Sequence, residues 1–566
     1  MERAEKKIKG GLNNKEINEE INLSKERLEY NLSLRKRKIN EILSKKRGSD
    51  KYKKEGKKDY QIEIEELKIP CDIKNQKYEN LEHFLKEMKK LIQSENIEYN
   101  KYALCCLRNQ TINNEGANNK NFYSESLVKQ NFLYDILNLI QKYFDNKSII
   151  CEGLWIIINI LYFQNNNFDL AIFLSSQQYI QLYIKILDKK DNYIRFNIYW
   201  LLSNLLFNNN YDLICQVLFH LYMSPLFRLY IIKDLEDINS NLTEEELRNL
   251  IYILGLLCDF INDIFTIFQN NNIKNFNHYN KEIDFNSIKE NNNYLNEHCF
   301  LIFMKYIENP NLTSFCILGL SKLTYFLENK DIYNKFYKSE ICSKIVKGQI
   351  KIEEEFINYS VQIIGNFIYF TPETLIEPIF LEETMTYFVK LLQAYPSKIL
   401  LKKDIFWSLS NINASTLSAS LLVNSGLILL ALQSICSDNN IVINEALYML
   451  LGFFYIKNIE IIINNYHLDY IKNLVLCLKN INNKCKTGES YTNQDIIERV
   501  LICIESLFKV GDLLKNEGMD NTFLTDFENS GGFELLGLML NERNLSDKLV
   551  KMEENLLKYH NDNKFY

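Results

Sequence analysis

The sequence predicts an all-α protein built as a solenoid of stacked helical repeats. Only 18 Gly and 6 Pro occur among 566 residues. Both residues punctuate turns and break helices, so their scarcity argues against a sandwich, a barrel or a Gly-rich nucleotide-binding fold. From about Leu81 onward, short apolar segments alternate with Asn-rich breaks, and a hydrophobic content of 46% suffices for a large core.

The first element is a basic arm, residues 1–58. Of the 66 Lys and Arg, 19 lie there with 10 of the 72 Asp and Glu, so the arm carries +9 and the remainder −15. Apolar residues recur at helical spacing from Ile17 to Leu43, and Asn13, which precedes them, is a candidate helix N-cap. We therefore expect an amphipathic basic helix that ends near Gly48 and folds fully against a partner. From charge alone, a solubilising tail or a nucleic-acid tether explains the arm equally well.

The next elements are a linker, residues 59–80, and a body of helical repeats, residues 81–562. Similar segments recur 45 residues apart at Trp155 and Trp200, 52 apart at Trp200 and Tyr252, and 41 apart at Trp407 and Tyr448. Such periods are typical of HEAT or armadillo repeats, whose stacking builds a solenoid with a long concave surface. The Asn-rich stretch at about 270–293 is predicted to be an inserted, mobile loop.

A Trp followed four residues later by an Asn marks three of these segments: Trp155 with Asn159, Trp200 with Asn204, and Trp407 with Asn411. This spacing puts both side chains on one helix face. A single helical Trp is usually a core residue, but the recurrence favours a groove. There each Asn would bind the main chain of an extended peptide, and parallel indole rings would hold Lys or Arg side chains by cation–π contact.

At these motifs the chain resembles the importin alpha family, armadillo-repeat adaptors that carry cargo bearing nuclear localisation signals. The resemblance rests on the order and spacing of several segments, which cover nearly the whole chain: Leu34–Lys38, Lys45–Arg47, Glu152–Asn159, Tyr199–Asn204, Arg248–Tyr252, Ile364–Asn366, Trp407–Asn411, Asn444–Tyr448, Gly531–Phe533 and Leu557–Tyr559.

The resemblance implies a right-handed superhelical solenoid of about ten armadillo repeats with two peptide-binding sites. It places Trp155, Asn159, Trp200, Asn204 and Tyr252 in a major site, and Asn366, Trp407, Ser410, Asn411, Glu445 and Tyr448 in a minor site. In the arm it assigns binding of an importin-beta-type carrier, and occupation of the groove when no carrier is bound, to Arg35, Lys36, Arg37, Lys38, Lys45, Lys46 and Arg47.

Further partners follow from the same resemblance: basic cargo proteins, and an export receptor at the C-terminal repeats. The protein would then shuttle between cytoplasm and nucleus. It would need no cofactor.

The departures from the family pattern concern both sites. Tyr252 and Leu256 stand where a Trp and its Asn are expected, and Asn208 stands where the family has an Asp that receives a deeply bound Lys. Tyr448 and Gly452 replace another Trp and Asn. We therefore expect the first site to be weakened and Trp407 with Asn411 to carry more of the binding.

Two rival classes are weighed against this interpretation. A general armadillo scaffold would explain the repeats but not a basic helix with two separated clusters. An enzyme is disfavoured because the six His are scattered and no metal-binding spacing, P-loop or nucleophile elbow occurs.

The remaining sequence features concern compartment and other surfaces. The acidic body argues against direct nucleic-acid binding, and no apolar run is long enough to span a membrane. The 13 Cys are expected to be reduced thiols, because their number is odd and no CxxC pair occurs.

Overall fold

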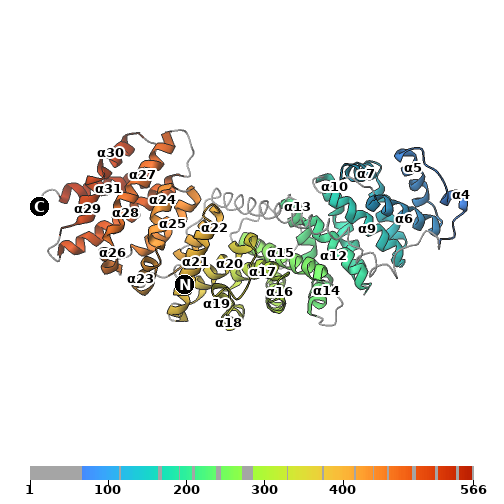
Figure 1. Cartoon of the computed structure of the whole chain (residues 1–566), viewed down its shortest axis with the longest axis horizontal. Helices are drawn as coiled ribbons and strands as arrows, with labels where there is room; N and C mark the ends of the chain where they lie inside the picture. The colour runs from blue at the N-terminus through green and yellow to red at the C-terminus, as the bar shows by residue number, and fades with distance from the viewer. Residues whose placement is uncertain are drawn as a thin grey trace. The chain divides into compact units, whose positions relative to one another are not determined.

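A computed structural model gives the structure (Figure 1). It describes residues 67–113, 117–163, 168–189, 191–206, 211–236, 244–269, 285–327, 329–372, 375–412, 416–437, 439–454, 458–486, 493–516, 520–542 and 547–563. Within these ranges there are 28 α-helices and no strand, which confirms the all-α prediction.

The chain divides into two compact units, Met1–Gly319 and Leu320–Tyr566, and the boundary falls inside α17 (Thr313–Leu323). The other described helices of unit 1 are α4 (Cys71–Lys74), α5 (Leu81–Ile92), α6 (Ile97–Asn113), α7 (Ala117–Lys129), α8 (Phe132–Lys142), α9 (Lys147–Phe163), α10 (Phe168–Leu174), α11 (Gln177–Leu187), α12 (Asn192–Leu206), α13 (Tyr211–Met223), α14 (Pro225–Glu236), α15 (Glu244–Gln269) and α16 (Phe285–Tyr306).

The described helices of unit 2, with its short 3₁₀ turns η3, η4 and η7, follow the same repeat pattern. They are η3 (Thr324–Phe326), α18 (Lys330–Ser339), α19 (Ile341–Val346), η4 (Glu354–Phe356), α20 (Ile357–Phe370), α21 (Pro378–Ala394), α22 (Ile399–Ser410), α23 (Thr416–Asn424), α24 (Leu427–Ser437), α25 (Asn440–Phe453), α26 (Ile459–Asn464), η7 (Tyr466–Leu468), α27 (Tyr470–Lys486), α28 (Asn493–Asn516), α29 (Thr522–Asn529), α30 (Gly532–Glu542) and α31 (Asp547–Asn563).

Within each unit, one helix of each repeat, which we call the third helix, packs on the third helix of the next repeat. In unit 1 this third-helix row is α6, α9, α12 and α15, and in unit 2 it is α20, α22, α25, α28 and α31. The second helices form another layer, in which α5 contacts α8, α11 contacts α14, and α24, α27 and α30 follow one another. Each repeat thus supplies one helix to each layer.

Second helices are buried on one face, whereas third helices are packed by neighbouring helices on several sides. The second helix α5 buries a single stripe, Phe84, Leu85, Met88 and Ile92, as expected for an amphipathic surface helix. The third helix α20 is packed on several sides, and all its residues from 359 to 368 are buried. This difference explains why the third-helix segments read as almost continuous apolar runs in the sequence.

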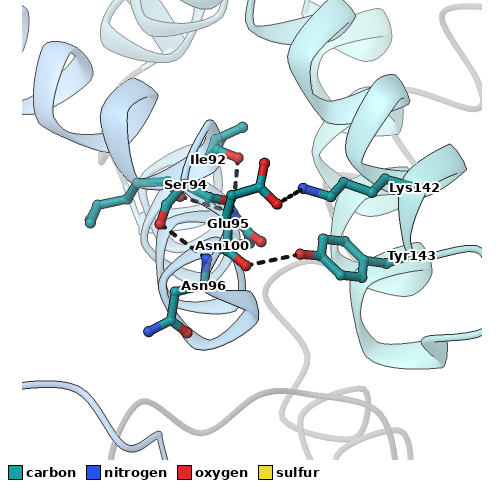
Figure 2. A network of polar contacts seen from close by, with 8 residues as sticks. Ile92, Ser94, Glu95, Asn96, Asn100, Lys142 and Tyr143 are labelled. Carbon is teal, nitrogen blue, oxygen red and sulfur yellow. Dashed lines mark hydrogen bonds and ion pairs between the residues drawn. The ribbon is translucent and has the colours of Figure 1, made fainter.

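Asparagine side chains terminate several helices and join them to the next element. Asn100 on α6 is fully buried, and its Nδ2 lies 2.8–2.9 Å from the carbonyl oxygens of Leu91, Ile92 and Ser94 at the end of α5 (Figure 2). Carbonyls at a helix C-terminus lack the intrahelical donors of the next turn, so the Asn100 amide supplies hydrogen bonds where α5 ends. Nearby, Lys142 at the end of α8 pairs with Glu95 at 2.8 Å.

Two segments predicted as a linker and as an inserted loop contain helix in the structure. Residues 67–80 are not a bare linker, because Leu67 and Ile69 are buried and α4 is held by the Tyr102 hydroxyl, which donates to the Ile73 carbonyl at 3.4 Å. The predicted insertion at 270–293 is helical from Phe285 onward, since Asn only weakly disfavours helix and α16 continues into a buried stripe. Residues 270–284 lie outside the described ranges.

Among the described helices, none alone is long and apolar enough to cross a membrane. The pair α23 and α24 passes that test only when taken together, and a bend of 70° separates the two helices.

Candidate functional site

In unit 1, Trp155 on α9 and Trp200 on α12 lie next to each other in the third-helix row. Their ring centroids are 5.4 Å apart, but the ring planes are perpendicular. The predicted parallel slot between them is therefore wrong here, because the indole quadrupole favours an edge-to-face contact. Phe196 packs on Trp200 at 5.5 Å, and only 6% of Trp200 is exposed. Trp155 is half-buried and offers the larger surface.

The two Asn partners in unit 1 behave differently. Asn159 is 4% exposed, and its Nδ2 donates to the hydroxyl of Thr111 on α6 at 3.2 Å. Thr111 in turn donates to the carbonyl of Arg108 at 2.7 Å. Asn204 is half-buried, and its buried Nδ2 has no hydrogen-bond partner within the described part of the chain. A ligand carbonyl that reached Asn204 would offset the cost of leaving this donor unpaired.

The remaining predicted site residue of unit 1, Tyr252, is buried. Tyr252 on α15 is 1% exposed, and its ring meets Phe315 edge to face at 6.2 Å. Leu256, one turn further on, is also buried. In this arrangement neither side chain presents a surface to a peptide.

A buried ion pair lies beside Trp155. Arg108 stands 47 residues before Trp155, and its Nη1 lies 2.6 Å from Oε1 of Glu152, one turn before Trp155 on α9. Glu152 also acts on Tyr193 of α12. The pKa of Tyr193 is raised to about 12, chiefly because the side chain is buried and then because of the charges of Cys151 and Glu152. Because Glu152 is already paired, its charge is largely neutralised for a ligand.

In unit 2, Trp407 on α22 lies against the backbone of α20. A Cβ on Gly365 would stand 2.7 Å from Cζ3 of Trp407 and closer still to Oγ of Ser408. Asn411, the C-cap residue of α22, donates from Nδ2 to the Gly365 carbonyl at 3.3 Å. Ser410 donates to the Trp407 carbonyl at 2.8 Å. Trp407, Ser410 and Asn411 are all half-buried and keep part of their surface open.

Asn366 on α20 repeats the arrangement of Asn159. It is 5% exposed, and its Nδ2 donates at 2.8 Å to Thr324, which donates to the Ser321 carbonyl at 2.5 Å. An Asn amide thus links a repeat to a Thr hydroxyl of the preceding repeat in both units. Sequence reasoning assigned these Asn residues to peptide binding and missed their structural bond.

The most exposed aromatic residue of the predicted sites is Tyr448 on α25, at 39%. Arg499 on α28 places its guanidinium carbon 4.4 Å from the Tyr448 ring centroid, and its Nη2 donates to the Tyr448 hydroxyl at 2.6 Å. Glu445, one turn before Tyr448, is half-buried. One turn after it, a Cβ on Gly452 would meet nothing within 4 Å.

Arg499 was missed in the sequence, although a signal was present. It lies 51 residues after Tyr448, close to the interval of 52 that separates Trp200 from Tyr252. Extending the repeat by one step would have placed Arg499 at the aromatic position of the next repeat.

The predicted arm residues Arg35, Lys36, Arg37, Lys38, Lys45, Lys46 and Arg47 lie outside the described ranges, as does Asn208.

No protein-family model matches the sequence, and no curated protein matches it. Among solved structures, an engineered protein is similar with a TM-score of 0.54 at 12% identity, over 84% of this chain and 99% of the other. A structure concerning the interaction of cadherin with β-catenin is similar with a TM-score of 0.53 at 10% identity, over 86% of this chain and 92% of the other.

A designed armadillo repeat protein in complex with the peptide (KR)4 also matches, with a TM-score of 0.34 at 16% identity, over 46% of this chain and 98% of the other. A TM-score this low does not establish a shared fold. At these identities the likenesses show the fold alone, and that fold is an armadillo-type solenoid of helical repeats.

Proposed function

We propose that this protein binds extended basic peptides along its third-helix rows, chiefly in unit 2. The supporting observation is the group on the packed helices α22 and α25, where Trp407, Asn411, Glu445 and Tyr448 all keep exposed surface. This set combines an indole face, a carboxamide and a carboxylate. It suits a Lys or Arg side chain and the peptide main chain beside it.

Arg499 supports the same chemistry from within the molecule. Its guanidinium rests on the Tyr448 ring and bonds to the hydroxyl, so this row already accommodates a cation on an aromatic face. In unit 1, Trp155 and Asn204 supply a smaller surface, since Tyr252 is buried. We therefore assign unit 2 the larger share of the binding free energy.

The biological role that we propose is that of a nuclear import adaptor. The basic clusters at residues 35–38 and 45–47 would bind an importin-beta-type carrier, the third-helix rows would bind nuclear localisation signals, and the C-terminal repeats would meet an export receptor. The protein would shuttle between cytoplasm and nucleus. The support is the resemblance of the ordered motifs to importin alpha, together with the charge division between a +9 arm and a −15 body.

A peptide titration tests the proposed binding. A fluorescent peptide with a cluster of Lys and Arg is titrated into the full chain and into Trp407→Ala, Asn411→Ala, Trp155→Ala and Trp200→Ala variants. We expect Trp407→Ala to weaken binding roughly 5- to 30-fold, because one cation–π contact and its buried area are lost, and Trp200→Ala to weaken it least. The matched control is Tyr134→Ala, an exposed aromatic residue on the second-helix layer. Equal affinities in all five variants would contradict the proposal.

The alternative is a general armadillo scaffold that uses the same rows for acidic or apolar partners. The similar β-catenin structure concerns an interaction with cadherin, so the fold is compatible with partners outside nuclear import. Two measurements separate the alternatives: pull-down of residues 1–58 with an importin-beta-type carrier, and titration of an acidic peptide in place of the basic one. Carrier capture favours the import adaptor, whereas preference for the acidic peptide favours the scaffold.

A further inference from the structure

We infer that the Arg499 side chain occupies the face of the Tyr448 ring on which a peptide cation would otherwise bind. The basic peptide site of unit 2 is thereby left with one aromatic ring that can accept a Lys or Arg side chain, which we call an aromatic slot. This inference rests on the proposed function and adds a specificity-determining residue to it. The open slot is the indole of Trp407. The second slot is the Tyr448 ring face, and Arg499 already occupies it.

The geometry of Arg499 carries the first step. Its guanidinium carbon is 4.4 Å from the centre of the Tyr448 ring, and Nη2 bonds to the hydroxyl at 2.6 Å. A guanidinium in this position uses the attraction that the ring would offer to a peptide cation. A peptide Lys or Arg must therefore displace Arg499 before it can take that ring face.

Charge reinforces this exclusion. The guanidinium of Arg499 is a cation, and a second cation beside it is repelled. Glu445 lies one turn before Tyr448 on α25, so this helix also carries a carboxylate that attracts a peptide cation. A Lys or Arg that reached the Tyr448 ring would meet the positive charge of Arg499 there.

The site consequently discriminates between peptides by the number and spacing of their cations. Packed helices lie about 8–10 Å apart, and an extended chain advances about 3.3–3.6 Å per residue. Two aromatic slots on successive third helices would thus accept cations about two to three residues apart. Because Arg499 occupies one slot, the second cation of such a peptide adds nothing to the binding affinity.

The structure also suggests a variant that retains the fold. The buried Nη1 of Arg499 has no hydrogen-bond partner among the described residues, so the arginine carries an unsatisfied donor in its present place. Arg499→Met keeps the aliphatic stem and removes the charge. Arg499→Lys keeps the charge and the cation–π contact, and serves as the matched control.

The test compares two peptides on the full chain: one with a single Arg flanked by small residues, and one with a second Arg three residues further on. In wild type and Arg499→Lys we expect the two peptides to bind within about twofold of each other. In Arg499→Met we expect the second Arg to improve affinity roughly 3- to 30-fold, as one cation–π contact provides. The single-Arg peptide can use only one ring at a time, so its affinity should change by no more than about twofold. Identical preferences in wild type and Arg499→Met would overturn the inference.

A second measurement keeps this outcome distinct from failure of the proposed function. With ring-labelled tyrosine, the NMR signal of Tyr448, assigned by Tyr448→Phe, is followed as methylguanidinium is added. We expect a saturable shift in Arg499→Met and none in wild type. If no basic peptide binds any variant, the proposed function fails, and the Tyr448 signal still decides on Arg499: equal responses in the two proteins, or no response in either, would refute its role as occupant.

Discussion

At the level of single residues, Gly452 is the simplest place to change the site. It stands one turn after Tyr448, where the resemblance expects an Asn, and a Cβ there would meet nothing within 4 Å. We predict that Gly452→Asn binds a basic peptide about 3- to 10-fold more tightly, because it restores one main-chain hydrogen-bonding amide. Peptide titration measures this effect.

The control for this change is Gly452→Ala. Each substitution removes a helical glycine, and alanine should stabilise α25 by about 0.5–1 kcal/mol. Only Gly452→Asn adds a carboxamide. If both variants bound the peptide more tightly, the gain in affinity would come from the stability of α25 and not from the new amide.

Asn100 is the residue whose loss should cost most stability near the start of the described chain. Asn100→Ala leaves the carbonyls of Leu91, Ile92 and Ser94 without this buried donor (Figure 2). We predict a loss of about 2–3 kcal/mol in the free energy of unfolding, with faster amide exchange in α5 and α6. Urea unfolding followed by circular dichroism, together with hydrogen exchange, measures both.

Glu95→Ala is the comparison, because the exposed pair of Glu95 with Lys142 lies beside the same turn. An exposed ion pair contributes little to stability, because solvent screens the two charges. If Glu95→Ala were as destabilising as Asn100→Ala, the hydrogen bonds of the Asn100 side chain would not be the main interaction that stabilises this turn.

At the level of elements, the close approach of α20 and α22 positions the indole of the unit 2 site. Gly365 permits it, since a Cβ there would stand 2.7 Å from Trp407 Cζ3. We predict that Gly365→Ala moves Trp407, lowers stability by about 1–3 kcal/mol through overpacking, and weakens basic-peptide binding. Thermal unfolding and peptide titration measure the two effects.

The matched variant is Gly537→Ala in α30, where a Cβ would meet nothing within 4 Å. It should leave peptide affinity unchanged and stability equal or higher. A neutral result at Gly365 would mean that α22 can shift without disturbing Trp407.

Element identity was predictable because the third helices are apolar on most sides and carry Trp and Asn four residues apart. The contacts of these side chains were not predictable. The angle between Trp155 and Trp200 involves Phe196, which packs on Trp200, and the burial of Tyr252 involves Phe315, 63 residues later. Such packing depends on the juxtaposition of repeats, which local spacing does not encode.

At the level of the whole molecule, the charge division predicts competition between the arm and peptides. Residues 1–58 carry +9 and the rest −15. At an effective concentration on the order of 1 mM, a tethered cluster with an intrinsic Kd of about 10 μM would lower peptide affinity about 100-fold. Deleting residues 1–58 should therefore strengthen basic-peptide binding by up to that factor, as measured by titration.

Salt provides an independent check of this competition. The attraction between the arm and the body is screened as ionic strength rises, so the gain from deletion should shrink between about 50 and 300 mM salt. An arm whose deletion leaves peptide affinity unchanged at low salt would not compete for the site.

The Asn-to-Thr bonds between consecutive repeats have a consequence for how this array could gain or lose modules. Asn159 donates to Thr111, and Asn366 donates to Thr324. Removing or duplicating a repeat at either junction would separate a buried amide from its hydroxyl acceptor, unless the new neighbour also supplied a Thr. These two junctions should therefore tolerate recombination poorly, and a shortened or lengthened descendant of this chain should retain both pairs intact.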